Sequence, residues 1–359
     1  MSLASLGLRH FRNIETADLH FSPVCNLIAG DNGAGKTNLL ESIFYLSLSR
    51  SFRTRHLRHL LPANADYLQL VGKVRDENGH ESVLGIRRST EGMTIRINGE
   101  TVHQSSRLAA FLPVQLIHPE SHQLLEQGPK QRRQFLDWGV FHVEPSFLSH
   151  WQDYRHCLKQ RNAALRQGQG EKAVRLWDER LIERGTSMTQ QRLSYLQQLR
   201  PHIDYFCRQL LESEIEVVYR QGWPKAQDFA SALREHLPTD QQQGFTRVGP
   251  HRADLAFFSD QHRVQDYFSR GQQKLLVCAL RLAQIRQLRQ ATGQAGVLLI
   301  DDLAAELDQA HRNALLEAAL KTEAQLFITT THPDLLDRAR LPACKLFHVK
   351  HGQVEEVVQ

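Results

Sequence analysis

A glycine-rich segment between an apolar stretch and an expected helix carries the strongest chemical signal in the sequence. Residues 30–37 read GDNGAGKT and fit the pattern G-x-x-x-x-G-K-[ST]. Glycines let the backbone curl so that successive N–H groups face phosphate oxygens, and the helix N-terminus adds partial positive charge. Lys36 would neutralise phosphate oxygens and Thr37 would ligate Mg²⁺. Rather than a structural turn, we expect a site for nucleotide phosphates and Mg²⁺, formed by Gly30, Asp31, Asn32, Gly33, Ala34, Gly35, Lys36 and Thr37.

Two adjacent carboxylates follow a later apolar run. The run Val297–Ile300 reads as a buried strand, and it ends in Asp301 and Asp302. Ligands of open parallel sheets gather at the carboxyl ends of the strands. We therefore expect Asp301 in the Mg²⁺ shell and Asp302 orienting or activating an attacking water. The alternative is that these acids only cap the next helix.

Three further segments could complete such a site. Ser269-Arg270-Gly271-Gln272 precedes an apolar helix, so it is either an N-cap or a second anion cradle for a nucleotide presented by another subunit. Glu306-Leu307-Asp308 follows the two carboxylates, and His332 follows a later strand. The His332 imidazole could touch a γ-phosphate, although a lone histidine at a strand end is more often solvated or helix-capping.

The elements that must position these residues suggest one α/β domain that is split along the chain. Strand patterns occupy the first third, interrupted by a helix from Lys36, and an Asn98-Gly99 turn suits a hairpin. Residues 129–241 read as a helical insert, with helices at 151–167, 172–184 and 190–211. Strands then alternate with helices, as in parallel βαβ units. We expect a head domain over 1–128 and 242–359, and an inserted helical arm over 129–241.

Composition limits the possible classes of protein. The 359 residues are 41% hydrophobic and 23% charged, which excludes disordered and fibrous classes. Lys and Arg exceed Asp and Glu by 44 − 39 = +5, and the pI near 9.0 leans toward a polyanionic partner. No apolar stretch is long enough for a membrane span, and no secretory signal is recognisable, so we expect a cytoplasmic protein. The five scattered cysteines are expected to be reduced packing residues; they are Cys25, Cys157, Cys207, Cys278 and Cys344.

Basic residues occur in three clusters that could contact phosphates without reading bases. The first comprises Arg50, Arg53, Arg55 and Arg58; the second Lys130, Arg132 and Arg133; the third Arg155, Lys159, Arg161 and Arg166. An ordinary solvated face is the alternative for each. Helix-turn-helix, zinc-finger and aromatic-platform patterns are missing from the sequence.

Taken in order, the glycine loop, the acidic strand end, Ser269 to Gln272, residues 306–308 and His332 resemble the ABC-type ATPase heads of the SMC and Rad50 class. More specifically, the chain resembles the RecF family along nearly its whole length. The segments that carry this resemblance are 11–13 (FRN), 129–133 (PKQRR), 135–137 (FLD), 159–162 (KQRN), 249–254 (GPHRAD) and 269–272 (SRGQ).

The resemblance implies a fold, an activity and partners. It implies an ABC-type P-loop head, a mixed sheet with flanking helices, that dimerises when ATP is bound. Gln115 is then the best candidate for a metal-sensing loop glutamine, Ser269 engages the partner's nucleotide with Gly271 and Gln272, and His332 is the switch histidine. Transporter-type heads usually carry Glu where Asp302 stands, so hydrolysis should be slow. We further expect a weak ATPase that DNA stimulates and whose main role is ATP-gated DNA binding. RecF-like proteins act in repair, replication restart and the SOS response, at single-strand gaps and single-strand/duplex junctions, with RecR, RecO and indirectly RecA.

Other P-loop proteins remain as alternatives. A transporter nucleotide-binding subunit would need no basic helical insert of this length. A kinase or GTPase would lack the segment from Ser269 to Gln272. A long-armed structural relative of SMC would need sustained heptads and a longer insert.

Overall fold

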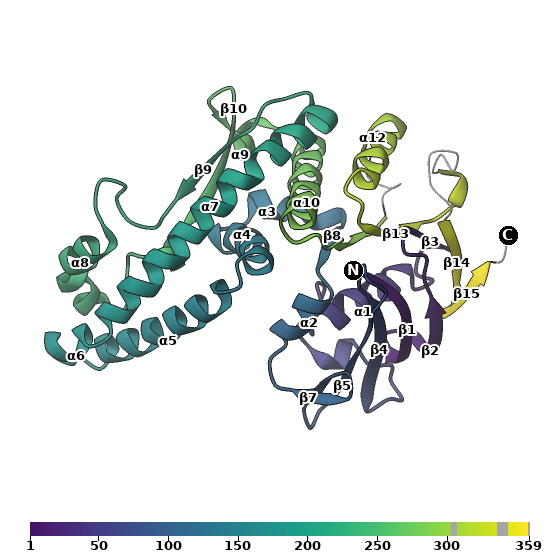
Figure 1. The fold of residues 1–359 in the computed structure, drawn as a ribbon, viewed down its shortest axis with the longest axis horizontal. Coiled ribbons are helices and arrows are strands. Elements are labelled where there is room, and N and C mark those ends of the chain that lie inside the picture. Colours follow the sequence, from purple (N-terminus) through teal and green to yellow (C-terminus); the bar gives the residue numbers. More distant parts are fainter. Residues whose placement is uncertain (303–306, 336–343, 358–359) are drawn as a thin grey trace. The chain divides into compact units, whose positions relative to one another are not determined.

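The computed structural model describes residues 1–302, 307–335 and 344–357 (Figure 1). Its contacts divide the chain into two compact units. Unit 1 comprises residues 1–121, 209–211 and 274–359, and unit 2 comprises residues 122–208 and 212–273. The functional division into a head and an arm stays a prediction.

A largely parallel sheet forms the centre of unit 1. Its strands run in the order β15-β14-β3-β13-β12-β8, and only β15 is antiparallel to its neighbour. Their bounds are β3 (Cys25–Ala29), β8 (Val114–Ile117), β12 (Val297–Ile300), β13 (Gln325–Thr330), β14 (Cys344–Lys350) and β15 (Gln353–Val357). Every residue of β3, β8, β12 and β13 is buried, as expected of parallel strands covered on both faces. The parallel strands therefore end together at one edge.

A second, antiparallel sheet belongs to the same unit. It consists of β1 (Ser2–Phe11), β2 (Ile14–His20), β4 (Tyr67–Arg75), β5 (Glu81–Ser89), β6 (Met93–Ile97) and β7 (Glu100–Val102), in the order β2-β1-β4-β5-β6-β7. The predicted hairpin turn is confirmed, because Asn98 and Gly99 both have positive φ and Ile97 pairs with Glu100. Strand β2 was not predicted from the sequence.

Helix α1 (Lys36–Leu48) packs against both sheets of unit 1. Leu39, Leu40, Ile43 and Leu46 are fully buried in the core cluster that also contains residues from each sheet. Other α-helices in the described part of this unit are α2 (Ser106–Phe111), α12 (Gln309–Leu320) and most of α10 (Arg270–Thr292). The Asp308 carboxylate accepts the His311 N–H and caps α12, whereas Glu306 lies outside the described residues.

Unit 2 is mainly helical, as the pattern of residues 129–241 predicts. Its helices are α3 (Gln123–Glu126), α4 (Pro129–Val143), α5 (Phe147–Arg166), α6 (Glu171–Arg175), α7 (Asp178–Leu211), α8 (Phe229–Gln243) and α9 (Val264–Tyr267). The small sheet β11-β10-β9 joins β9 (Glu216–Arg220), β10 (Asp254–Ser259) and β11 (His262–Arg263).

The prediction of a break between two helices was wrong. The sequence suggested separate helices at 172–184 and 190–211, but α7 runs unbroken from Asp178 to Leu211. Gly185 lies inside this helix, where a Cβ would come within 2.6 Å of the Phe229 ring and 3.1 Å of the Tyr154 ring. The glycine therefore marks close packing of the helix rather than its end.

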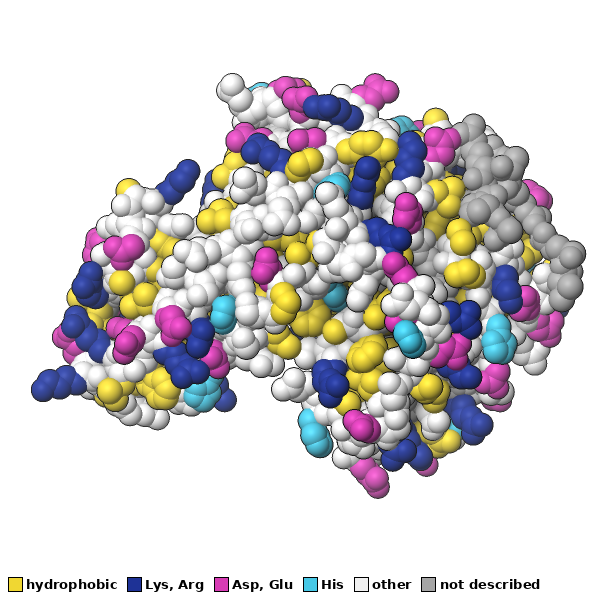
Figure 2. Space-filling model, in the orientation of Figure 1, with side chains coloured by type: hydrophobic (Ala, Val, Ile, Leu, Met, Phe, Trp, Pro, Cys, Tyr) yellow, Lys and Arg dark blue, Asp and Glu magenta, His cyan; other side chains and the backbone are white. Residues whose placement is uncertain are grey.

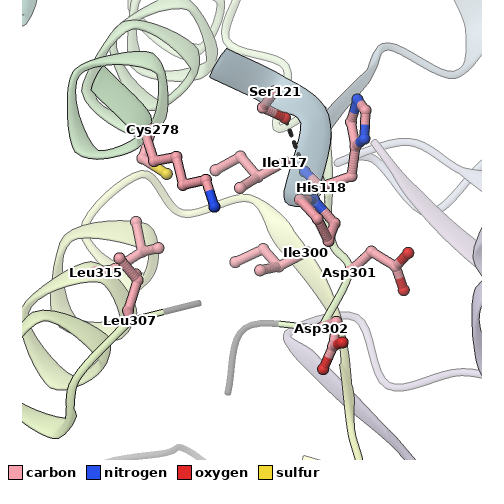
Figure 3. A pocket seen from close by; sticks show the side chains of 11 residues that line it. Ile117, His118, Ser121, Cys278, Ile300, Asp301, Asp302, Leu307 and Leu315 are labelled. Carbon is pink, nitrogen blue, oxygen red and sulfur yellow. Dashed lines mark hydrogen bonds between the residues drawn. The ribbon is translucent and has the colours of Figure 1, made fainter. Parts of the chain in front are cut away.

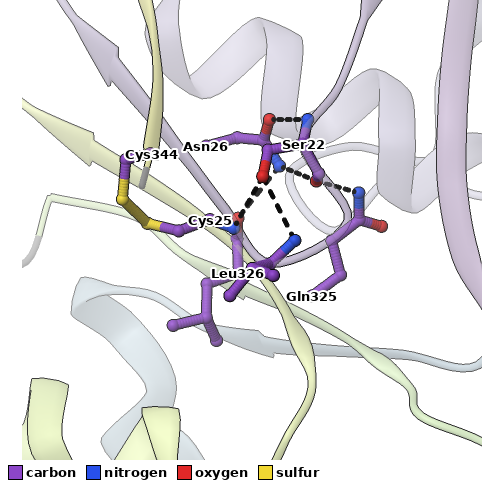
Figure 4. The surroundings of a disulfide bond; sticks show 7 residues. Ser22, Cys25, Asn26, Gln325, Leu326 and Cys344 are labelled. Atoms are coloured by element: carbon purple, nitrogen blue, oxygen red, sulfur yellow. Dashed lines mark hydrogen bonds between the residues drawn. A yellow bond between two sulfur atoms is a disulfide. The ribbon is translucent and has the colours of Figure 1, made fainter. Parts of the chain in front are cut away.

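The prediction of five reduced cysteines was wrong for two of them. Cys25 and Cys344 form a disulfide between the first residues of β3 and β14 (Figure 4), although 319 residues separate them. The parallel register places the two residues side by side with their Cα atoms 4.7 Å apart. Such proximity leaves no trace in the spacing of the sequence. The other three cysteines, Cys157, Cys207 and Cys278, are free and buried as expected.

The polar residues around this bond join the two sheets of unit 1. The Gln325 amide accepts the Leu3 N–H at 2.7 Å and donates to the carbonyls of Leu3 and Ser22. Asn26 accepts the Ser22 N–H and donates to the Leu326 carbonyl (Figure 4). These buried amides hold the starts of β3 and β13 in register. In the described part of the chain, no helix combines the length and apolarity that a bilayer crossing demands.

Candidate nucleotide-binding site

The glycine-rich segment forms the loop between β3 and α1. Gly33 and Gly35 have φ of +79° and +122°, a region that favours glycine, and Lys36 begins the helix. The Lys36 side chain turns back over the loop, and its ammonium donates to the Gly30 carbonyl at 2.7 Å and to the Asp31 carbonyl at 2.9 Å. Only 7% of Lys36 is exposed. The loop is thus already curled around its own cation.

The expected magnesium ligands meet at the carboxyl edge of the parallel sheet. The Thr37 hydroxyl lies 2.9 and 3.0 Å from the two carboxylate oxygens of Asp301. The Thr329 hydroxyl donates to Asp301 at 2.8 Å and accepts the Asp302 N–H at 2.7 Å. Strand β13 lies between β3 and β12, so its Thr329 reaches both acids from the neighbouring strand. Asp302 has a positive φ of +51°, which turns the chain sharply after β12.

Burial raises the pKa of Asp301 above its ordinary value, and the nearby Asp302 adds to this effect. The hydrogen bonds from Thr329 and Thr37 oppose the rise, since they favour the charged form. One carboxylate and one hydroxyl oxygen suit Mg²⁺, which keeps several waters and takes phosphate oxygens for the rest of its shell. Across residues 1–302, 307–335 and 344–357, no group of three or more His, Cys, Asp or Glu could hold a metal without such help.

A small hollow adjoins the two acids (Figure 3). Ile117 and Ile300 end their strands at this hollow, and Cys278 and Leu315 approach it from helices (Figure 3). The full lining is Ile117, His118, Pro119, Ser121, Lys274, Cys278, Ile300, Asp301, Asp302, Leu307 and Leu315. Sequence reasoning missed His118 and Lys274. The position of His118, directly after a buried apolar strand, was the available signal.

Gln115 lies away from this edge, inside β8. It is buried, its amide nitrogen donates to Gln284 at 2.8 Å, and its amide oxygen accepts from Arg281 at 2.8 Å. Both ends of the amide are thus used between β8 and α10, and the structure does not bring Gln115 to Thr37 or Asp301. His332 is exposed after β13, where its carbonyl accepts the Thr330 hydroxyl.

The segment from Ser269 to Gln272 is exposed at the start of α10. The Ser269 hydroxyl accepts the Gln272 N–H at 3.3 Å, and the Gln272 side chain accepts the Ser269 N–H at 2.9 Å. This reciprocal pair is a capping box. Ser269, Gly271 and Gln272 all belong to the exposed surface, so the cap leaves them accessible to a ligand. Their role toward a nucleotide stays a prediction.

The first basic cluster lies close to α1. Arg50, Arg53, Arg55 and Arg58 are all exposed. Arg53 donates to the Asn38 side chain at 2.8 Å and lies 3.6 Å from Glu41. Arg12 forms two hydrogen bonds with the buried Glu41, at 2.8 and 2.9 Å. Arg53 therefore links this cluster to the helix that begins at Lys36.

The other two clusters divide into surface and interior residues. Lys130 is exposed, but Arg132 is only 7% exposed and donates to Asp254, Leu125 and Gln127. Arg133 is half-buried and donates to the Ala253 carbonyl. In the third cluster, Arg161 is fully buried between Asp178, Asp240 and Thr246. Burial therefore weakens the expectation that Arg132 and Arg161 contact DNA.

Arg155 and Lys159 remain exposed on α5, along a groove that Trp151 and Asn162 also line. Arg155 lies over the Trp151 ring at 4.6 Å. On the face drawn in Figure 2, Lys and Arg side chains are interspersed with Asp and Glu. A polyanion would thus meet local basic clusters on this face rather than one continuous basic surface.

Comparisons with known proteins agree with this geometry. A family model described as RecF/RecN/SMC N terminal domain matches residues 2–355. The chain is 41% identical to the DNA replication and repair protein RecF of Shewanella oneidensis over 357 residues, which are 99% of both chains. It is 40% identical to the protein of the same name from Hydrogenovibrio crunogenus over 353 residues, 97% of each.

Solved structures show the same relationship. A structure of the recombination mediator protein RecF-ATPrS in the RecFOR pathway matches with a TM-score of 0.88 and 27% identity, covering 99% of this chain and 98% of that one. The Smc head domain from Pyrococcus furiosus matches with a TM-score of 0.62 at 14% identity over 99% of this chain and 96% of that one, a likeness of fold alone. The predicted fold class, an α/β ABC-type P-loop head with helical additions, is confirmed. The chain belongs to the RecF/RecN/SMC N-terminal domain family.

Proposed function

We propose that this chain is an ATP-dependent DNA-binding protein of recombinational repair and replication restart, which acts as an ATP-dimerised clamp and helps to load a recombinase. The observation that carries the proposal is the meeting of Lys36, Thr37 and Asp301 at one edge of the parallel sheet. The similarity to RecF proteins over 99% of the chain supports the mediator role and does not favour a transporter subunit or another P-loop enzyme.

The loop and its lysine would hold the triphosphate. Backbone N–H groups of the curled loop and of the α1 N-terminus would face the phosphates. The Lys36 ammonium now bonds to the Gly30 and Asp31 carbonyls, and bound phosphate oxygens would replace these neutral acceptors with charged ones. The solved relative named RecF-ATP supports ATP as the nucleotide.

Thr37 and Asp301 would supply two oxygen ligands to a magnesium ion, which when bound neutralises charge on the phosphates. Thr329 keeps the Asp301 carboxylate oriented toward Thr37. Asp302 follows on the same edge and would orient the attacking water or accept its proton. Its side chain is one methylene shorter than Glu, and this supports slow hydrolysis suited to a timed clamp.

A dimer would complete the site. Ser269, Gly271 and Gln272 are exposed at the start of a long helix, where a hydroxyl and backbone N–H groups suit an anion held by a second copy. His332 is exposed after β13 and would approach the γ-phosphate. We assign Gln115 no contact with the metal, since its amide bonds to Gln284 and Arg281.

DNA is the proposed partner, at single-strand gaps and single-strand/duplex junctions, with RecR and RecO as cooperating proteins, RecA downstream and the cytoplasm as location. The exposed Arg50, Arg53, Arg55 and Arg58 support phosphate contacts close to the nucleotide loop. We propose the exposed Lys130, and the half-buried Arg133 to a lesser extent, as further contacts.

The decisive experiment measures dimer formation by light scattering with ATP and Mg²⁺, with and without gapped duplex DNA. We expect a monomer without nucleotide, a dimer with ATP, and a longer-lived dimer on gapped DNA. A protein that stays monomeric with ATP and binds DNA equally with and without nucleotide would contradict the clamp.

A further inference from the structure

The phosphate-binding loop is held from outside by two segments far apart in sequence. The Ala34 carbonyl accepts the Asn13 side-chain N–H at 3.0 Å and the Gly352 backbone N–H at 2.9 Å. Asn13 lies in the turn between β1 and β2, and Gly352 lies in the turn between β14 and β15. The carbonyl of one loop residue thus receives donors from both sheets of unit 1.

Asn13 fits closely against the loop. Its side-chain oxygen accepts a hydrogen bond from the Asn38 side-chain amide at 2.8 Å, so the Asn13 amide bridges the loop and the first turn of α1. A Cβ added at Gly35 would lie 2.8 Å from the Asn13 side-chain oxygen and 3.1 Å from its nitrogen. Because Gly35 has no side chain, the Asn13 amide can occupy this space.

The turn at Gly352 is equally close. Gly352 has φ +81°, and a Cβ there would lie 2.0 Å from the Asn13 carbonyl oxygen. Strand β14, which precedes this turn, approaches the loop in the same way. A Cβ at Gly30 would lie 2.2 Å from the carbonyl oxygen of Val349 in β14. Strand β14 and its turn consequently contact the first glycine of the loop, Asn13 and Ala34.

We propose that Asn13 and Gly352 are positioning residues of the nucleotide site, which fix the Ala34 peptide so that the loop N–H groups face the phosphates before nucleotide arrives. A peptide plane carries its C=O and the next N–H in opposite directions. Two donors on the Ala34 carbonyl therefore aim the Gly35 N–H the other way, away from Asn13 and Gly352. The inference rests on the proposed nucleotide site and deepens it.

The pre-set loop has an energetic consequence. A loop that is already ordered loses less conformational entropy when a ligand binds. The smaller entropic cost raises the affinity for the ligand. Asn13 and Gly352 need not touch the nucleotide to produce this effect. Their loss should raise the dissociation constant for every ligand that the loop grips through phosphates, including ADP and inorganic tripolyphosphate.

The first test replaces Asn13 by a residue of similar size that cannot donate. Asn13→Leu should weaken ADP and tripolyphosphate binding by about 5-fold, the loss expected for one neutral hydrogen bond. Asn13→His can present a ring N–H at a similar reach and should recover most of the affinity. Asn78→Leu, in an exposed turn of the same unit, is the control and should bind as the unaltered protein does.

The second test uses a glycine pair matched in backbone conformation. Gly352→Ala and Gly99→Ala both place a side chain at positive φ, +81° and +87°, but a Cβ at Gly99 has no atom within 4 Å. Both variants should lose some thermal stability, whereas only Gly352→Ala should lose nucleotide affinity. Equal affinities in this pair would overturn the role of Gly352.

A readout without nucleotide separates this inference from the proposed function. Hydrogen exchange of amides 33–37 in the nucleotide-free protein should accelerate in Asn13→Leu and Gly352→Ala and stay unchanged in the two controls. If Asn13→Leu binds tripolyphosphate normally and exchanges normally, the positioning role is wrong while ATP-gated DNA binding stands. If the unaltered protein binds neither nucleotide nor tripolyphosphate, the nucleotide site and the positioning role both fall.

Discussion

The Thr37 hydroxyl contacts both carboxylate oxygens of Asp301, at 2.9 and 3.0 Å, across 264 residues of sequence. This contact joins the start of α1 to the end of β12, and so connects the two strongest motifs of the chain. Neither motif includes the residue that steadies the pair, because Thr329 comes from β13 between them.

Lys36→Met should abolish nucleotide binding, since it removes the only cation of the phosphate loop while retaining much of the apolar stem. We expect a loss of ATP affinity of at least 100-fold, in line with about 3 kcal/mol for charge-assisted hydrogen bonds to phosphate. Filter binding with labelled ATP measures it, with Lys73→Met on the exposed face of β4 as control. Unchanged ATP affinity would contradict the assignment of the loop.

Asp302→Asn should slow hydrolysis while leaving ATP binding intact. The amide keeps the shape of the side chain but cannot accept a proton from water, and general-base contributions are typically 10²–10⁴-fold in rate. The ATP-bound dimer should then last longer, as light scattering after ATP addition would show. A variant that hydrolyses ATP at the normal rate would remove Asp302 from the mechanism.

Arg55→Ala and Arg58→Ala should weaken DNA binding uniformly across sequences. On duplex DNA, log affinity should fall with log salt at a slope of about −0.9 for each phosphate contacted, and each lost contact should reduce the slope by about one. Titrations at several salt concentrations measure this. Affinity that does not depend on salt would remove the electrostatic argument for this cluster.

Arg161→Ala should destabilise unit 2 rather than weaken DNA binding directly. The fully buried guanidinium is 2.8 Å from both Asp178 and Asp240, and its removal leaves Asp240 buried without its cation. Breaking a buried pair in this way costs about 3–5 kcal/mol. Thermal unfolding measures the loss, and Arg166→Ala, exposed at the end of the same helix, should leave the melting temperature nearly unchanged.

Unit 2 should lose stability as the pH falls below about 6.5. Burial lowers the pKa of His251 to about 4, and its ring lies between the Tyr154 hydroxyl at 2.6 Å and the Thr246 carbonyl at 3.1 Å. Between these pH values the unfolded chain binds a proton that the folded chain does not, so the free energy of unfolding falls with falling pH. The loss is about 1.4 kcal/mol per pH unit from this group.

Burial also lowers the pKa of His142 to about 3, so this histidine acts in the same direction. Denaturant unfolding at pH 7 and pH 5 checks the prediction, and His251→Gln should flatten the dependence. A pH dependence that His251→Gln leaves unchanged would contradict the assignment to His251.

The sequence predicted several local elements of the fold well, because each depends on a short pattern. The loop at 30–37, the acidic end of β12 and the Asn98-Gly99 hairpin all follow from neighbouring residues. The order of strands in the parallel sheet does not follow from any such pattern. Thr329 was therefore missed, since its contacts with Asp301 and Asp302 arise only when β13 takes its place beside β12.

Burial was the second property that sequence reasoning could not supply. Arg132 and Arg161 occur in basic runs that resemble a surface, yet both are held inside unit 2 by Asp254 and by Asp178 with Asp240. Their carboxylate partners lie many residues away. A run of arginines in the sequence thus does not show which of them contact phosphates at the surface and which form buried ion pairs.

The bond between Cys25 and Cys344 closes a macrocycle from which only the two chain ends protrude. One cut by a protease anywhere between the two cysteines would leave the fragments covalently attached. On a denaturing gel such a nicked molecule would keep its full mass until a thiol reagent is added, and would then separate into two bands.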